Sequence, residues 1–176
     1  VAINGQLISL SANGTAGDVP ILSQGDILLS SVDRAQVIRS QGRQQGGDVR
    51  LRSSRRIAVA GDLDSFSPDG TGGSVELLAG GSITVGNLNT FGDLESGDVA
   101  IASERGAITT GDIATIAPNG TSGSVTLTAQ LDISTGDVSS TGLESGDINL
   151  TSIDGEVLTG TVSSTTGTVA IGDDVV

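Results

Sequence analysis

The stretch that decides the fold is Gly97-Asp98-Val99-Ala100-Ile101-Ala102-Ser103, one of seven related heptapeptides in the chain. Each copy begins with Gly, carries Val or Ile at its third position, and has a second aliphatic residue two places later. Successive copies begin 21 to 30 residues apart, and they read GDVPILS from Gly17, GDVRLRS from Gly47, GSVELLA from Gly73, GDVAIAS from Gly97, GSVTLTA from Gly123, GDINLTS from Gly146 and GTVAIGD from Gly167. A recurrence at this spacing indicates a solenoid.

Within each heptapeptide the apolar residues alternate, as Val49 with Leu51 and Val99 with Ile101. Period two places these side chains on one face of a strand. Two further strands follow in each unit, for example 57–59 and 63–66 after 49–52, and 107–109 and 113–116 after 99–102. Three short one-sided strands cannot bury their apolar faces alone, so they predict a three-sided coil that stacks in parallel on the next.

Glycine also recurs just before the third strand of each coil, where the chain must turn a corner. We expect these glycines to adopt a positive φ there; they are Gly61, Gly86, Gly111, Gly136 and Gly160. No segment keeps a 3.6-residue apolar period, which excludes helix. The prediction is an all-β parallel β-helix of about seven coils, each of roughly 21–26 residues with three short strands.

The first 46 residues are the least regular part of this pattern. A strand is expected over 6–10, Pro20 removes a ladder hydrogen bond inside the next strand, and residues 41–46 are expected to form an extended polar loop. From Gly47 the units alternate in their linkers, so that 47–96 and 97–145 align as double coils. We expect one β-helix segment over 1–176, with irregular coils in 1–46 and paired coils in 47–176, taken from a longer array.

Composition narrows the class of protein further. The net charge is −13, with 27 Gly, two Phe, and no His, Cys, Met, Trp, Tyr or Lys. This charge disfavours nucleic-acid and anionic-membrane partners, and no apolar run is long enough for membrane insertion. Regular Val, Ile and Leu positions argue against disorder. An acidic chain without Cys or Lys is typical of an exported bacterial surface protein.

Calcium binding and catalysis are both poorly supported by motifs. The acids Asp62, Asp64 and Asp69 only loosely resemble an EF-hand loop, and the nine-residue Ca²⁺ repeat is absent. A shared cation between Asp112 and Asp137 is the alternative to ordinary solvated turn carboxylates. A two-carboxylate glycosidase would use Asp62 with Asp64 or Glu104, but nearly every Asp obeys the repeat. We therefore expect no cofactor and no enzyme activity.

Arginine breaks the repeat. Seven of the eight Arg lie between positions 34 and 56, namely Arg34, Arg39, Arg43, Arg50, Arg52, Arg55 and Arg56. Arg50 and Arg52 alternate with Val49 and Leu51 and should project outward. The candidate contact patch comprises Arg43, Arg50, Arg52, Arg55 and Arg56, for an acidic glycan or a neighbouring subunit. The competing interpretation is pairing with local acids such as Asp33 and Asp48.

Three longer stretches carry a family resemblance. They are GGSVELLAGGSITVGNLNT (72–90), SGDVAIASERGAITTGDIAT (96–115) and SGSVTLTAQLDISTGDVSST (122–141). They resemble the haemagglutinin-type repeats of large two-partner-secretion proteins, which are filamentous haemagglutinin-like, and are closest to the Gly-Asp-Ile-x-Thr-rich cyanobacterial type. The resemblance implies a right-handed parallel β-helix, secreted to the bacterial cell surface, that serves as adhesin, filament or stalk.

The leading hypothesis is therefore a structural or adhesive extracellular rod. Its expected partners are further copies of the chain, stacked end to end, and cell-surface glycans. The alternatives are a carbohydrate-active β-helix enzyme acting on acidic polysaccharide, and a Ca²⁺-stabilised binding module.

Overall fold

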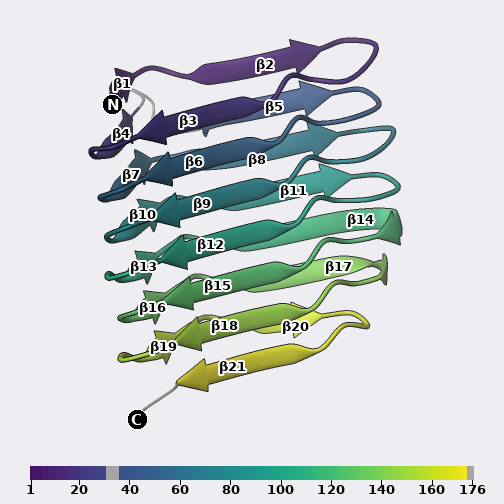
Figure 1. The fold of residues 1–176 in the computed structure, drawn as a ribbon. Helices are drawn as coiled ribbons and strands as arrows, with labels where there is room; N and C mark the ends of the chain where they lie inside the picture. The colour runs from purple at the N-terminus through teal and green to yellow at the C-terminus, as the bar shows by residue number, and fades with distance from the viewer. Residues whose placement is uncertain (31–35, 174–176) are drawn as a thin grey trace.

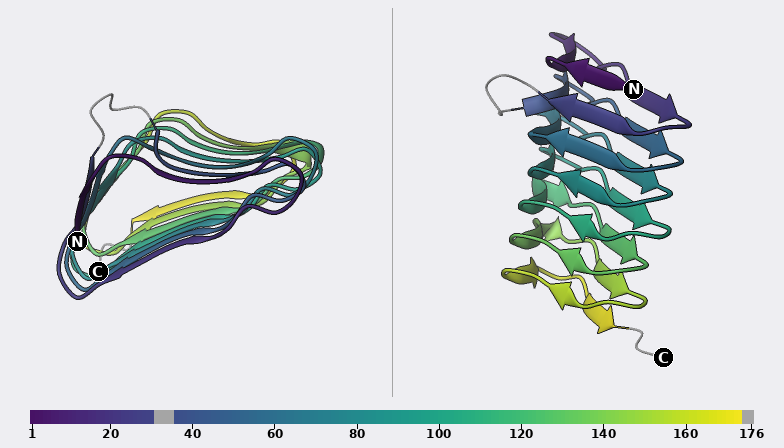
Figure 2. Two further views of the ribbon diagram at one scale, coloured as in Figure 1. Left: turned by 90° about the horizontal axis from the view of Figure 1, so that it is seen from above. Right: turned by 90° about the vertical axis from the view of Figure 1, so that its left-hand side faces the viewer.

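The protein is a parallel β-solenoid of seven coils with three strands in each coil (Figure 1). The computed structural model describes residues 1–30 and 36–173. No helix occurs in these residues, and every pairing between the named strands is parallel. Seen along the axis, the coils superpose on a flattened outline with one short and two long sides (Figure 2).

The short side is sheet A. It is built from the short strand that follows each of the first six heptapeptides, together with one strand that precedes the first heptapeptide. Its strands have two to four residues. In order they are β1 (Ala2–Asn4), β4 (Ile27–Ser30), β7 (Ile57–Ala60), β10 (Ile83–Val85), β13 (Ile108–Thr109), β16 (Ile133–Ser134) and β19 (Val157–Leu158).

The long sides are sheets B and C. Sheet B contains β2 (Leu7–Ser11), β5 (Gln36–Gly42), β8 (Asp62–Ser67), β11 (Leu88–Gly92), β14 (Ile113–Thr121), β17 (Val138–Glu144) and β20 (Val162–Ser164). Sheet C holds the heptapeptides and contains β3 (Val19–Ser23), β6 (Val49–Ser53), β9 (Val75–Ala79), β12 (Val99–Ser103), β15 (Val125–Ala129), β18 (Ile148–Ser152) and β21 (Val169–Asp173).

Register explains why the heptapeptide is so regular. Val99 pairs with Val75 on one side and with Val125 on the other, and Ile101 pairs with Leu77 and Leu127. Each aliphatic residue therefore sits in a column of its own kind that runs along the axis, where it is buried. Such columns remove apolar surface from water on both sides of every coil that lies between two others.

The irregular first coils differ from expectation in three respects. A strand not foreseen, β1, precedes β2; Gln41 and Gly42 belong to β5 and not to a loop; and Gln45 bridges both Thr15 and Thr71. Pro20 breaks no ladder bond to β6, because the Val19 N–H donates to Asp48 O at 2.8 Å and alternate residues of β3 face the open edge. Proline is tolerated at such an edge.

The corner glycines are needed for a different reason from the predicted one. Among the five, only Gly61 has a positive φ, at 152°. At the other corners a Cβ atom would strike the acidic or amide side chain of the preceding coil: at Gly136 it would lie 2.1 Å from Asp112 Oδ1, and at Gly111 2.3 Å from Asn87 Oδ1. Close approach between coils, and not backbone conformation, excludes a side chain here.

Candidate functional site

The arginine patch begins on β6, which points Arg50 and Arg52 away from the core. The two side chains are 46% and 50% exposed, whereas Val49 and Leu51, which alternate with them, are fully buried. The alternation predicted from the sequence is confirmed. Both guanidinium groups therefore lie on the outer face of sheet C.

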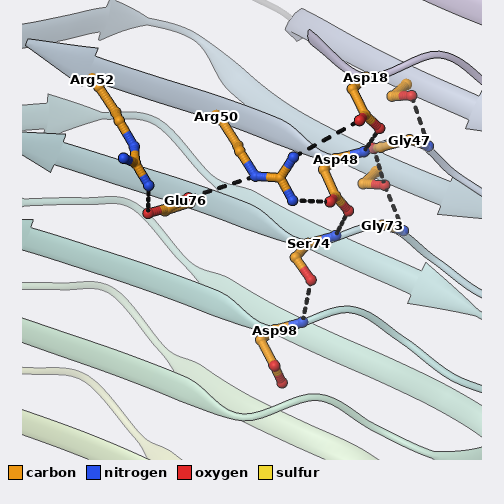
Figure 3. A network of polar contacts seen from close by, with 11 residues as sticks. Asp18, Gly47, Asp48, Arg50, Arg52, Gly73, Ser74, Glu76 and Asp98 are labelled. Carbon is orange, nitrogen blue, oxygen red and sulfur yellow. Dashed lines mark hydrogen bonds and ion pairs between the residues drawn. The ribbon is translucent and has the colours of Figure 1, made fainter. Parts of the chain in front are cut away.

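Acidic side chains of three coils surround these two arginines (Figure 3). Arg50 forms an ion pair with Asp48 of its own coil and lies 3.8 Å from Asp18 Oδ2 and 3.6 Å from Glu76 Oε2. Arg52 Nη2 donates to Glu76 Oε1 at 2.7 Å. The charge of this part of the patch is therefore largely balanced by local acids, as the competing interpretation proposed.

The remaining predicted residues do not join this cluster. Arg43 lies in the linker before β6 and pairs with Asp69 at 2.6 Å, which raises the pKa of Arg43 through a hydrogen bond and charge attraction. Arg56 lies beyond the other end of β6 and pairs with Asp26 at 3.0 Å. Arg55, beside it, has no acidic partner within 1–30 and 36–173. Arg34 and Asp33 lie outside the described residues.

These ion pairs add little to stability. Most of the side chains concerned are between a third and two-thirds exposed, and exposed pairs contribute roughly 0–1 kcal/mol each. Their main effect is to reduce the free positive charge that an anionic ligand could use. The sequence-based patch is thus two separated groups, at opposite ends of β6, joined by a balanced middle.

A groove of about 460 Å³ opens beside this balanced middle. Its lining includes Leu22 and Leu78 as apolar residues, with Arg52, Glu104 and Arg105 as charged ones. Arg105 was not singled out from the sequence; its Nε donates to Gly80 O at 3.0 Å, and no acid of the described chain pairs with it. The groove combines an apolar wall with one unbalanced guanidinium.

The repeated Asp residues have a structural role that the sequence did not reveal. Asp48 Oδ1 accepts the backbone N–H of Ser74 in the next coil at 2.9 Å, and Asp98 Oδ1 accepts that of Ser124 at 2.7 Å. At Ser74, which stands where other copies have Asp, the hydroxyl does the same and accepts the Asp98 N–H at 3.2 Å (Figure 3). Each carboxylate therefore holds the following coil at a corner, where the ladder is interrupted.

The corner before the third strand repeats this arrangement. Asp62, Asn87, Asp112 and Asp137 each accept the N–H one coil below, at 2.7–2.9 Å. Asp147 lies at the other kind of corner, just before a strand of sheet C. The backbone N–H and the hydroxyl of Thr168 both donate to its carboxylate and lower its pKa, because they favour the charged form. At Asp147 these bonds therefore favour the carboxylate that accepts them.

Other proposed acidic sites are not assembled in the same way. Asp112 and Asp137 are linked through a backbone N–H, and no group of three acidic side chains in the described ranges is arranged to hold a metal ion. Glu104 follows β12 at the corner between sheets C and A, whereas Asp62 lies at the corner between sheets A and B. Asp62 and Glu104 therefore lie at different corners of the coil, whereas Asp62 and Asp64, the other predicted pair, both belong to β8.

A buried hydroxyl ladder on sheet B was missed by the sequence analysis. Ser65 is fully buried; its Oγ accepts the Gly73 N–H at 2.8 Å and donates to Gly47 O at 3.0 Å. The same column contains Ser40, Thr90, Thr115, Ser140 and Ser164, and each of their hydroxyls donates to the carbonyl of a heptapeptide glycine. The serines donate to the glycine that precedes them in the chain, whereas Thr90 and Thr115 donate to the glycine that follows them. The signal was present as a Ser or Thr two residues after the first aliphatic residue of each third strand.

No protein-family model, curated protein or solved structure matched the chain when it was compared with each. The described part of the chain has no helix that is long and apolar enough to cross a membrane. The class that the structure defines is the parallel β-solenoid.

Proposed function

We propose that the chain is a structural or adhesive segment of an extracellular bacterial rod. The observation that carries the proposal is the unbroken stacking of seven coils in which the repeated Asp, Ser and Thr side chains bond the neighbouring coil. Side chains that bond the backbone of a neighbouring coil are not available to act on a substrate. The composition and the resemblance of the repeats to haemagglutinin-type repeats support export to the cell surface as part of a two-partner-secretion protein.

A rod of this kind supplies length. Seven coils at the strand spacing extend only about 34 Å along the axis, so a filament or stalk requires more coils than these. Any contact with a cell-surface glycan is proposed for the groove beside Arg52 and Arg105, where apolar surface adjoins a guanidinium. The rod itself performs no reaction.

Duplication of residues 97–145 tests the proposal. Residues 96 and 145 are both Ser and residues 97 and 146 are both Gly, so a second copy inserted after 145 recreates native junctions. We expect a folded protein about 10 Å longer along its axis, with a higher thermal midpoint, measured by small-angle X-ray scattering and circular dichroism.

The same preparation separates the rod from an enzyme. Incubated with acidic polysaccharides, a rod leaves their length distribution unchanged in both the original and the duplicated chain. Shortened polysaccharide, or a duplicated chain that unfolds or aggregates, contradicts the proposal.

A further inference from the structure

One long edge of the rod carries an exposed Leu-Glu step in two of its inner coils. This edge, the tip, consists of the linkers 93–98, 118–124 and 143–147, which join sheet B to sheet C (Figure 1). Leu94 and Leu143 are 53% and 69% exposed, and Glu95 and Glu144, which follow them, are exposed as well. The tip therefore offers paired apolar and acidic groups to solvent, at the side of the stack and away from its ends.

The coil between the two steps leaves a gap in the tip. Thr121 pairs with Glu95 on one side and with Glu144 on the other, so the two steps lie two coils apart. At the strand spacing this separation is about 10 Å. Gly120 packs directly against the backbone of Leu94, since a Cβ atom there would lie 1.8 Å from Leu94 O. Along the axis the tip is therefore raised, hollowed and raised again.

The groove of about 460 Å³ has a matching profile. Leu22, Arg52 and Leu78 line it from one outward-facing column of sheet C, so its two leucines are also two coils apart, with a protruding arginine between them. Leu22 is 80% exposed and Leu78 is partly exposed. Both point sideways from the sheet and not along the axis. The groove thus has two apolar positions at the spacing of the tip leucines.

Unbalanced positive charge lies beside these apolar positions. Among residues 1–30 and 36–173, neither Arg55 nor Arg105 forms an ion pair. They follow β6 and β12, which are two coils apart in sheet C. Arg105 Nε donates to Gly80 O at 3.0 Å, which holds its guanidinium over the coil of Leu78. Two cationic groups therefore accompany the two apolar positions, again with a two-coil period.

We propose that the tip of one copy seats in this groove of a second copy, so that rods associate side by side. Each leucine of the tip packs on a leucine of the groove, and each glutamate meets one of the two unpaired guanidinium groups. Gly120 leaves room for Arg52. This inference rests on the proposed rod function and names the lateral partner of the rod. A seated tip covers Arg105, so a second copy and a glycan exclude each other at this groove.

Two charge effects oppose the contact and keep it weak. Glu104 lines the groove next to Arg105 and repels the glutamates of the tip. The net charge of −13 also drives copies apart, although salt at physiological strength screens this repulsion beyond about 8 Å. Glu104→Gln should therefore strengthen association about threefold, measured by sedimentation equilibrium.

Charge exchange between the two surfaces tests the contact by the same method. Glu95→Arg/Glu144→Arg alters the tip, and Arg55→Glu/Arg105→Glu alters the groove. We expect each double variant to associate about tenfold more weakly than the original chain, and an equimolar mixture of the two to regain the association. Each substitution changes the net charge of −13 by only two units, so both variants remain acidic and net charge cannot draw them together.

Leucine variants give a second readout that leaves every charge in place. Leu94→Ser/Leu143→Ser should weaken association about tenfold, because it removes the apolar part of both steps. Leu10→Ser/Leu158→Ser is the matched control, since these leucines are 64% and 71% exposed but lie on the outer faces of sheets B and A. The control should associate like the original chain. Circular dichroism of all variants should match the original.

Monomers at all concentrations in both the original chain and Glu104→Gln would overturn the inference, as would a mixture of the charge variants that associates no better than its components. Polygalacturonate that binds to monomers and is lost on Arg105→Glu would also overturn it, and would assign the groove to a glycan. These results leave the rod proposal standing if the duplicated chain still folds and lengthens. Failure of the duplicated chain, with the lateral contact intact, contradicts the rod proposal instead.

Discussion

At the residue scale, the polar side chains of this protein act mainly as backbone acceptors. An interrupted ladder leaves N–H groups unpaired at every corner, and buried unpaired groups are costly. Asp Oδ1 on the outside and Ser or Thr Oγ on the inside supply the missing partners. This explains why the corner acids follow the repeat so closely, since corner residues such as Asp48, Asp98 and Asp137 each accept a backbone N–H of the next coil.

Substitution of the buried hydroxyl tests this role. Ser65→Ala leaves the Gly73 N–H and Gly47 O without their partner inside the coil. We expect a loss of about 1–3 kcal/mol in the free energy of unfolding, seen as a lower denaturation midpoint. Ser65→Thr, which keeps the hydroxyl used at Thr90 and Thr115, should stay close to the original, and an equal loss in both variants would refute the ladder.

At the element scale, the corner glycine and the acid before it form one device. The side chain of Asp112 lies over Gly136 and reaches the N–H of Asp137, so the glycine provides the space that the carboxylate occupies. The sequence showed both residue types in the right places but not their dependence on each other. A glycine in a turn ordinarily indicates a positive φ, and here that reason applies only to Gly61 among the five corners.

Gly136→Ala should therefore destabilise the corner by about 1–3 kcal/mol, because the new methyl group displaces Asp112 Oδ1. Gly25→Ala is the matched control, since a Cβ there meets nothing within 4 Å. In a background carrying Asp112→Ala the effect of Gly136→Ala should shrink. Thermal midpoints of the four variants measure this coupling, and independent effects at 112 and 136 would disprove it.

At the scale of the whole molecule, stability should vary along the axis. Each coil contacts only its neighbours, as in other solenoids, and the outermost coils have one neighbour each. The central strands β9, β12 and β15 are covered on both sides, while β3 and β21 are edges. The molecule is therefore a stack whose ends open more easily than its middle.

Amide hydrogen exchange measures this gradient. Protection should be greatest in β9, β12 and β15 and least in β1–β3 and β19–β21 at low protein concentration. Uniform protection along the chain would show cooperative unfolding of the whole molecule and contradict this expectation.

The sequence by itself determined the strands, the three-sided coil and the axial columns. These depend on local alternation and on repeat spacing, which can be read residue by residue. Only the tertiary structure decided what the polar residues do. Asp18, Asp48, Arg50 and Glu76 meet because coils 24 to 30 residues apart in sequence lie on neighbouring rungs. Contacts between neighbouring coils depend on the register of the strands, which the sequence does not specify residue by residue. The arginine patch was therefore predicted as one surface. In the structure the charges of Arg50 and Arg52 are balanced by nearby acids, and the other arginines of the patch lie beyond the two ends of β6.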